Sequence, residues 1–496
     1  MAIISAAWIV LLPLSDQLFA QTPAPTASVL PASGPAAISA STLGNGMDLI
    51  LLPLPESVSV SLGIVFKGGA EAQTKKTAGL FRLLEKVLFR GTAASPGEPE
   101  PAGAMDSLGA TSIEGGALSD RFGLSFLLAP EMLGQGLDTI AYLFSGLRLE
   151  TAFSDPLTLE QARSSSLTDI AQALSDPKAI FEAAMAKKLF SAAPWRFDIL
   201  GTDAIINAAD ENTLKEIAGT WLVPNNAALI IAGNFSIETV LPMIEKSFSS
   251  WKKAADPWKS PMPAFPKPGV TRPTLMVYAD ASLPPGEALI EMRYRGPDAG
   301  SGKSASAELW AEMASQPGSR LAQAITKGMP KGSSPSAITA RYQLSSCGSW
   351  FSVSARILLD AKVNAAENVF SFKEIVRGSE MYAMKTSSGY FTPKEYARAK
   401  EALVEKRNDM FADPQEAASA IADGWVLGGS AWIQAWSDRI AGMTSKDITA
   451  FADEYFMKNL EVVSIHLEPG DYAARKKGFD AYGFEIITPQ KAFWWK

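Results

Sequence analysis

The chain contains an internal repeat, and this repeat constrains the possible fold more than any other feature. The segment SDPKAIFEAA, around Asp176–Pro177, has a counterpart in ADPQEAASAI, around Asp413–Pro414. The stretch INAADENTLKEIAGTWLVPNNAALIIAGNF, from Ile206, has a counterpart in IAGMTSKDITAFADEYFMKNLEVVSIHLEP, from Ile440, at nearly the same offset. Both copies run from a Thr or Ser cap through an amphipathic helix to a hydrophobic strand. We therefore predict an α+β fold with two tandem homologous domains, each an antiparallel sheet covered by helices.

Changes in composition along the chain indicate where the two domains begin and end. Residues 256–273 contain six prolines, which cannot donate backbone hydrogen bonds, so we expect a semi-rigid spacer there. The other expected parts are a signal peptide (1–20), a Pro/Ala-rich linker (21–45), an N-terminal domain (46–255), a C-terminal domain (274–480) and an aromatic tail (481–496).

The N-terminus, MAIISAAWIVLLPLSDQLFAQTPAP, favours export over a membrane anchor. Its apolar run is short for a transmembrane helix, and LFA before Gln21 is a plausible signal-peptidase site, although the usual basic start is missing. A nearly Cys-free exported chain suits a bacterial periplasm. We therefore expect a periplasmic protein with no stable membrane span after cleavage, and an uncleaved anchor is the alternative.

Charge and residue counts exclude several classes of function. The net charge is −7 and no Lys/Arg block is present, which argues against nucleic-acid binding. The chain has one His, His466, and one Cys, Cys347, too few for a zinc site built from these residues. A catalytic Cys needs a His partner. We expect both residues to be structural.

The stretch TAGLFRLLEKVLFRGT (77–92) has the apolar spacing of a buried helix. It carries Arg82, Glu85 and Lys86 at positions i, i+3 and i+4. A Glu between two His at this spacing, H-x-x-E-H, is the inverted zinc-peptidase motif. Here both outer positions are cations.

With these stretches in order, the chain resembles the pitrilysin/insulinase family of inverted-zincin metallopeptidases over roughly residues 42–475. The resemblance rests on FKGGAEAQTKKTAGLFRLLEKVLFRGT, LGATSIEGGALSDR, the SDP helix, WLVPNNAALIIAGNF and SQPGSRLAQAI. It implies half of a clam-shell peptidase, because the family's shell contains four such domains and this chain supplies two.

The resemblance also implies which positions would carry the chemistry. Active members would have His at the positions of Arg82 and Lys86, Glu at 85, and a further Glu ligand where this chain has Asp169. Their substrate-gripping Arg and Tyr would fall near Thr326 and Pro335, and neither residue type is present there. The residues that active members would use for catalysis, metal binding and substrate binding are therefore incomplete in this chain.

The substitutions at the motif predict that zinc is absent. Arg offers no lone pair to a metal, and Lys86 would first have to lose its proton, at a cost of roughly 4–5 kcal/mol at pH 7. Without zinc, Glu85 has no metal-bound water to activate. Our hypothesis is that Arg82 and Lys86 replace the metal electrostatically by pairing with Glu85 and Asp169; the alternative is that they point into solvent.

The leading functional prediction is a non-catalytic subunit of a two-subunit peptidase. It would pair with a zinc-bearing homologue or with itself, complete the peptide chamber and hold extended peptide at a sheet edge. One alternative is a scaffold without peptide binding; another, by family resemblance alone, is a zinc metallopeptidase. A hydrolase using Ser119 or Ser319 is disfavoured, because no G-x-S-x-G elbow is present.

Overall fold

The structure is a computed structural model that describes residues 38–90, 101–144, 146–260, 262–266, 269–329 and 334–496. The predicted signal peptide and residues 21–37 of the predicted linker lie outside these ranges. Among the helices of the described residues, none combines the length and the apolar character needed to cross a membrane.

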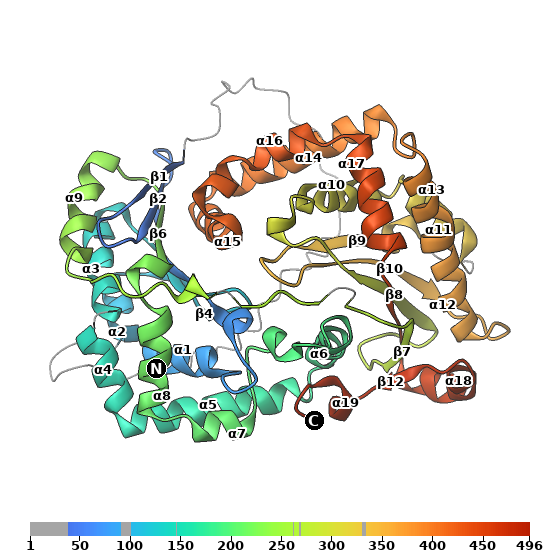
Figure 1. The fold of residues 1–496 in the computed structure, drawn as a ribbon, viewed down its shortest axis with the longest axis horizontal. Helices are drawn as coiled ribbons and strands as arrows, with labels where there is room; N and C mark the ends of the chain where they lie inside the picture. The colour runs from blue at the N-terminus through green and yellow to red at the C-terminus, as the bar shows by residue number, and fades with distance from the viewer. Residues whose placement is uncertain (1–37, 91–100, 145, 261, 267–268, 330–333) are drawn as a thin grey trace. The chain divides into compact units, whose positions relative to one another are not determined.

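The first sheet, sheet A, lies on the left in Figure 1. It has six strands in the order β1-β2-β6-β3-β5-β4. Its neighbouring strands are antiparallel except β2 and β6, which are parallel. The strands are β1 (Ser39–Thr42), β2 (Asp48–Pro53), β3 (Val60–Lys67), β4 (Thr111–Ala117), β5 (Arg121–Leu128) and β6 (Ala227–Gly233).

The second sheet, sheet B, repeats this topology in the order β12-β7-β11-β8-β10-β9. Strands β7, β11, β8, β10 and β9 take the places of β2, β6, β3, β5 and β4, which confirms the tandem α+β fold. In addition to the antiparallel pairing we expected, both sheets contain parallel pairs: β2–β6 in sheet A, and β7–β11 and β7–β12 in sheet B. The strands are β7 (Thr274–Ala279), β8 (Glu287–Arg295), β9 (Ile338–Gln343), β10 (Trp350–Leu358), β11 (Val462–Leu467) and β12 (Glu485–Ile487).

Each sheet packs one face against helices of its own half. In β2, Leu49 and Leu51 face these helices, whereas Ile50 and Leu52 face the other way, as the two-residue period of a strand requires. The helices of the first half are α1 (Leu80–Arg90), α2 (Pro101–Ser107), α3 (Leu133–Leu143), α4 (Gly146–Ser154), α5 (Pro156–Ala173), α6 (Pro177–Leu189), α7 (Asp203–Ala208), α8 (Glu211–Trp221) and α9 (Ile237–Phe248). Those of the second half are α10 (Ser304–Ser315), α11 (Arg320–Gly328), α12 (Ala365–Lys373), α13 (Tyr382–Thr386), α14 (Pro393–Ala412), α15 (Pro414–Gln434), α16 (Trp436–Gly442), α17 (Ser445–Phe451), α18 (Pro469–Ala481) and α19 (Pro489–Ala492).

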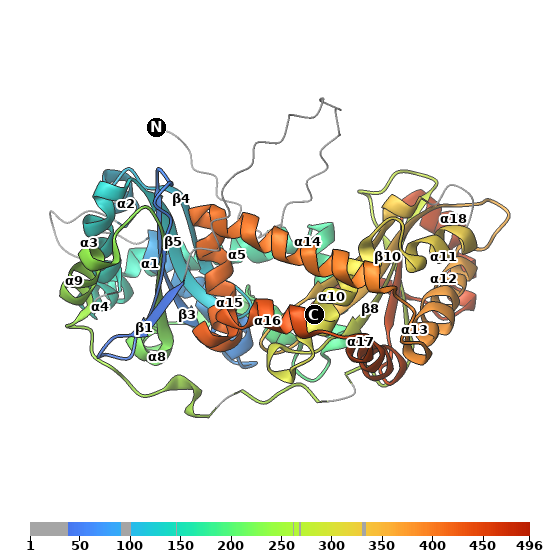
Figure 2. The same cartoon turned by 90° about the horizontal axis from the view of Figure 1, so that it is seen from above.

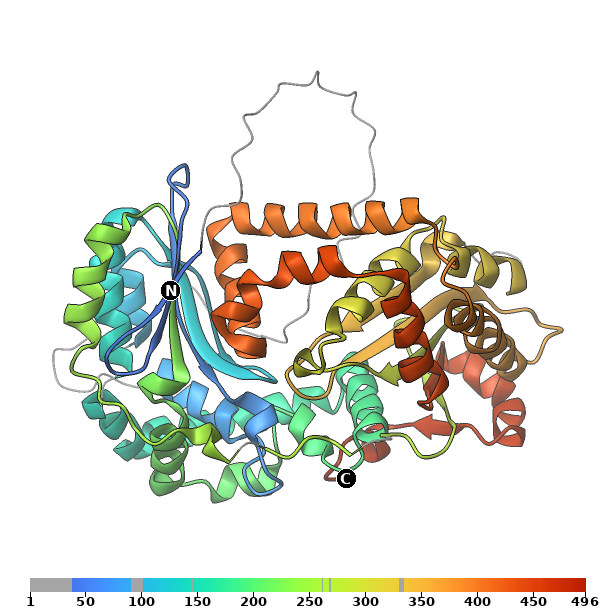
Figure 3. The ribbon, with the colours of Figure 1, turned by 45° about the horizontal axis from the view of Figure 1, so that its top comes forward.

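The second face of each sheet is covered by a helix from the opposite half. Helix α15 packs on β3 and β6 and lies beside sheet A in Figures 1, 2 and 3. Helix α6 packs on β11 and β12 of sheet B (Figure 1). These are the two helices whose Asp-Pro starts repeat in the sequence: Asp176 and Asp413 are their N-caps and accept backbone N–H bonds. The repeated sequence motif therefore marks an exchange of helices between the two halves, which we call the crossed helices.

Three expected boundaries need correction. Ser39–Thr42 of the predicted linker forms β1 and pairs with β2. In the predicted spacer 256–273, Phe265 and Val270 are buried in the core between α6 and sheet B. The predicted tail 481–496 adds β12 to the edge of sheet B and then packs on α6, because its aromatic residues bury apolar surface there.

Candidate functional site

The degenerate motif lies on α1, a helix with one strongly apolar face. Leu83, Leu84 and Val87 are fully buried in the core against sheet A. With these side chains directed to the core, the three-to-four-residue spacing places Arg82 and Lys86 on the side of the helix that packs against α5. The sequence pattern therefore fixes where the motif points.

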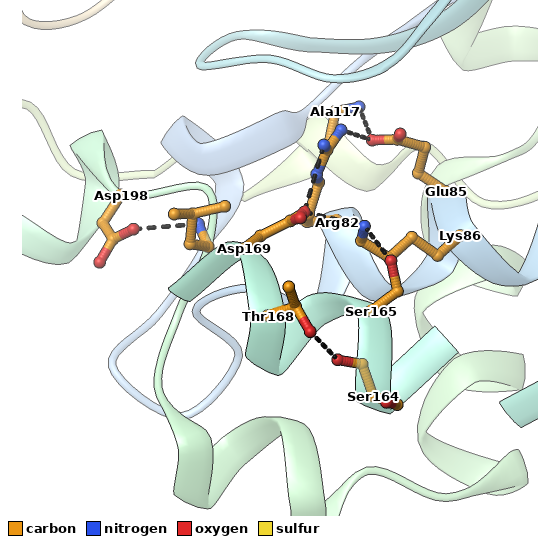
Figure 4. Close-up of polar contacts among 10 residues, drawn as sticks. Arg82, Glu85, Lys86, Ala117, Ser164, Ser165, Thr168, Asp169 and Asp198 are labelled. Carbon is orange, nitrogen blue, oxygen red and sulfur yellow. Dashed lines mark hydrogen bonds and ion pairs between the residues drawn. The ribbon is translucent and has the colours of Figure 1, made fainter. Parts of the chain in front are cut away.

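The structure brings Arg82, Glu85, Lys86 and Asp169 together between α1 and α5 (Figure 4). Arg82 Nη1 lies 2.5 Å from Glu85 Oε2, and Arg82 Nη2 lies 3.3 Å from Asp169 Oδ2. Lys86 Nζ lies 2.8 Å from the same Asp169 oxygen and donates to Ser165 Oγ at 2.8 Å. The Lys86 side chain is 2% exposed and that of Asp169 24%. The residues form the internal cluster of our hypothesis and do not point into solvent.

Glu85 also contacts the edge strand of sheet A. The backbone N–H of Ala117, in β4, donates to Glu85 Oε2 at 3.1 Å. Gly116 makes this approach possible: its φ is +122°, and a Cβ there would lie 2.4 Å from Glu85 Oε2. The cluster therefore joins α1, α5 and β4.

The residues of the cluster do not fit a zinc ion. Two cations occupy the places where the family has imidazoles, and they already neutralise both carboxylates. Across the described ranges, no group of three or more His, Cys, Asp or Glu side chains is arranged to hold a metal ion. The side chains of the cluster therefore do not supply the ligands for a metal ion that would activate water.

The two expected substrate-binding positions carry neither the Arg nor the Tyr of the family's pattern. Thr326, on α11, donates its hydroxyl to the carbonyl of Ala322 one turn earlier at 2.8 Å. Pro335 begins a short 3₁₀ turn, Pro335–Ala337, and its side chain lies outside the described atoms.

The structure gives no hydrolase site at the two serines named from the sequence. Ser319 caps α11, where its hydroxyl accepts the N–H of Ala322 at 3.0 Å, and it is 2% exposed. Ser119 is exposed beside the turn between β4 and β5. The single histidine, His466, lies in β11 of sheet B, so it partners neither serine in a catalytic arrangement.

Sheet B contains a Ser–His–Asp group that we did not expect from the sequence. Ser464 Oγ lies 3.3 Å from His466 Nε2, and His466 Nδ1 lies 3.6 Å from Asp280 Oδ2. Ser464 is fully buried and the ring of Phe181, from α6, packs against His466 at 4.3 Å. A nucleophile sealed in this way cannot meet a substrate, so the group is structural, as expected for His466. The Ser-x-His spacing in a strand was the signal available in the sequence.

A second missed feature is a buried carboxyl between the halves. Glu71, in the 3₁₀ turn before α1, accepts hydrogen bonds from the hydroxyls of Ser345 and Ser346 in the second half. Burial raises the pKa of Glu71 to about 7, although both hydroxyls act in the opposite direction. Arg196 donates to the backbone oxygen of Glu71 and to the sulfur of Cys347. No local pattern indicates these contacts, because their partners lie far apart in the sequence.

Comparisons with known proteins support the resemblance seen in the sequence. The profile of the family described as Peptidase M16 inactive domain matches residues 209–403. An uncharacterized zinc protease of Rickettsia bellii is 23% identical over 215 residues, 42% of this chain and 49% of that protein. The resemblance to the pitrilysin/insulinase (M16) family is confirmed. The matched domain is described as inactive, and it lies C-terminal to the helix that carries Arg82 and Lys86.

Solved M16 structures share the fold. A putative M16-like peptidase from Alicyclobacillus acidocaldarius has a TM-score of 0.69 at 17% identity, over 88% of this chain and all of that one. The periplasmic protease PqqL from Escherichia coli has a TM-score of 0.67 at 17% identity, over 90% of this chain but 49% of its own. The chain thus spans about half the length of the curated relative and of PqqL, and its fold is that of one M16 half-unit.

Proposed function

We propose that this chain is a non-catalytic half-unit that completes the peptide chamber of an M16-type peptidase assembly. The observation that carries the proposal is the neutral cluster between α1 and α5, in which Arg82 and Lys86 are paired with Glu85 and Asp169. A site whose carboxylates are held by two fixed cations has neither the ligands nor the charge balance for a catalytic zinc. We therefore propose that the chain works without zinc.

The partner we propose is a zinc-bearing homologous chain, with a second copy of this chain as the alternative. The support is size: the fold corresponds to about half of PqqL, so a complete two-half assembly needs another half-unit. We also propose that the protein is exported to the periplasm. The apolar start of the sequence and the periplasmic location of PqqL support this proposal.

The first test is to purify the native protein without added metal and to measure its zinc content and its co-purifying chains. We expect no stoichiometric zinc, a zinc-bearing homologue in the complex, and peptide cleavage that falls when this chain is removed. One tightly bound zinc and peptide cleavage by the chain alone would overturn the proposal.

A variant that restores the family's zinc ligands tests the role of the two cations in the cluster. The triple substitution Arg82→His, Lys86→His and Asp169→Glu restores the ligand types of the family's motif. We expect this variant to bind zinc measurably while the native chain does not. Equal zinc content in the two proteins would contradict the role that we assign to the cations.

The second candidate is a scaffold that does not bind peptide. One observation favours it: neither expected substrate position presents a free gripping group, since Thr326 bonds its own helix. If the purified complex contains no zinc-bearing chain and cleaves no peptide, the scaffold becomes the better proposal.

A further inference from the structure

We infer that the degenerate motif closes the β4 edge of sheet A against the addition of another strand, with Glu85 as the closing group. The inference goes beyond the proposed function, because it assigns the cluster a role in the isolated chain. It would hold whether the partner is a zinc-bearing chain, a second copy or none.

The starting observation is that β4 is the outermost strand of sheet A. An edge strand presents unpaired backbone groups and is a template for pairing with another chain. In β4, the N–H of Ala117 is already taken, because it donates to Glu85 Oε2. An incoming strand would have to displace a charged acceptor to bond this group.

The closing group is held rigidly by its neighbours. Arg82 fixes Glu85 from the same helix and is itself tied to Asp169 on α5. Gly116 leaves the space that the carboxylate occupies. The substitution that removes a zinc ligand, Arg82, thus supplies the cation that keeps Glu85 on the strand.

Two further features of β4 also oppose the addition of another strand. The register with β5 shifts between Thr111 and Glu114, and Ser112 within this bulge has a φ of +47°, which is unusual for a residue with a side chain. Gln415, at the start of α15, donates to Glu114 Oε1 at 2.5 Å. Bulges and covering helices are both ways in which proteins protect an edge.

In sheet B, a side chain from the corresponding helix also contacts the outermost strand. Strand β9 occupies the place of β4, and the helix after the equivalent strand, α10, carries Ser315. Ser315 Oγ lies 2.6 Å from the carbonyl oxygen of Ala340 in β9 and 2.7 Å from that of Ala311, so its one proton is shared between them. A side chain from the corresponding helix contacts the backbone of the edge strand in both halves, which supports a function in closing the edge.

The test measures the Ala117 amide and strand addition in the full chain. We would compare the native protein with the charge-neutral double variant Arg82→Leu/Glu85→Ala by residue-resolved hydrogen exchange. We would also titrate each protein with a fluorescein-labelled peptide of eight alternating Val and Thr residues, and with the same peptide N-methylated at alternate nitrogens, which cannot pair as a strand. We expect the Ala117 amide to exchange about 10- to 100-fold faster in the variant. We also expect only the variant to bind the unmethylated peptide.

The matched control is Lys215→Leu/Glu211→Ala, which removes an ion pair of 2.7 Å from α8 and should change neither readout. If the double variant does not fold, hydrogen exchange of the native protein alone tests the inference. An Ala117 amide that is not protected from exchange in the native protein overturns it. Peptide binding by the native chain as tight as by the variant also overturns it. A zinc-loaded, active native chain would instead overturn the proposed function, because that outcome is read from metal content and not from Ala117.

Discussion

At the scale of single residues, the charges of the cluster between α1 and α5 lie in matched pairs. Lys86 is almost completely buried, and it pairs with Asp169 and donates to Ser165. A buried charge that loses its partner is costly, whereas the intact pair can be close to neutral for stability. Individual substitutions in the cluster should therefore be more harmful than charge-neutral double ones.

The substitution Asp169→Ala should lower the free energy of unfolding by about 2–3 kcal/mol, because it leaves Lys86 buried without its carboxylate. This is less than for a fully buried pair, since Asp169 is partly exposed. Denaturant unfolding measures the change. Glu160→Ala, which removes an exposed ion pair with Arg163 from the same helix, should cost under about 0.5 kcal/mol and serves as control. Equal costs for the two would show that the cluster is not a stability element.

Glu71 should make the folded state less stable as the pH rises, whereas a salt-bridged carboxylate makes it more stable. Its pKa is raised from 4.5 to about 7 in the folded chain, so between these values the folded state holds a proton that the unfolded state has released. The free energy of unfolding should therefore fall by on the order of 2–3 kcal/mol as the pH rises from about 4.5 to above 7.

The variant Glu71→Gln isolates this contribution, because its amide oxygen can still accept the hydroxyls of Ser345 and Ser346. Denaturant unfolding at pH 5 and pH 8 should show a smaller pH dependence in this variant than in the native chain. Glu216→Gln, at an exposed position on α8, should leave the dependence unchanged. A native-like pH dependence in Glu71→Gln would contradict the assignment.

At the scale of elements, close approach between α1 and β4 depends on a glycine. Gly116 has a positive φ, and the position that a Cβ would occupy there lies only 2.4 Å from Glu85 Oε2. Only a residue without a side chain satisfies both conditions. The contact of α1 with β4 therefore depends on the glycine at position 116.

The substitution Gly116→Ala should lower the free energy of unfolding by about 2–4 kcal/mol, through backbone strain and displacement of Glu85. Gly109→Ala is the matched control, because Gly109 also has a positive φ, +64°, but has no atom within 4 Å of an added Cβ. Its cost should be about 1 kcal/mol, from the backbone alone. Thermal and denaturant unfolding of both variants separate the cost of backbone strain from the cost of displacing Glu85. Equal losses of stability in the two variants would mean that the close approach of Glu85 does not restrict the residue at position 116.

At the scale of the whole molecule, the crossed helices make the two halves depend on each other. Each sheet has an apolar second face against which a crossed helix of the opposite half packs, and each buried large apolar side chain there contributes about 1.5–3 kcal/mol. The sheet A residues covered by α15 are Ile50, Leu52, Val65, Ala228, Ile230 and Ala232. Separating the halves would expose these faces to water.

Cutting the chain between the halves should therefore leave them associated. A specific protease site inserted after Ala254, in an exposed stretch, would be cleaved in the folded protein. We expect the two fragments to co-elute on size exclusion in native buffer and to separate only in denaturant. The fragment ending at Ala254, expressed alone, should bind a hydrophobic dye through its uncovered sheet face. Separation of the fragments in native buffer would show that the crossed helices do not hold the halves together.

The sequence by itself determined the duplication, the tandem α+β fold and the helix that carries the motif. These are local properties: they follow from hydrophobic periodicity, Asp-Pro helix starts and the chemistry of single side chains. The sequence also placed Arg82, Lys86 and Glu85 on one side of a helix, and the resemblance supplied Asp169 as the fourth member of the cluster.

Only the tertiary structure decided where the repeated helices pack, that Glu85 binds the N–H of Ala117, and that Glu71 meets Ser345 and Ser346. The partners in these contacts are separated by long stretches of chain, and no periodic pattern encodes which distant surface will cover an apolar face. It also decided that the linker and tail contain β1 and β12, because a short strand forms only where a sheet edge is available to pair with it. The physical reason is the same in each case: local propensity selects the elements, and burial between distant segments selects their partners.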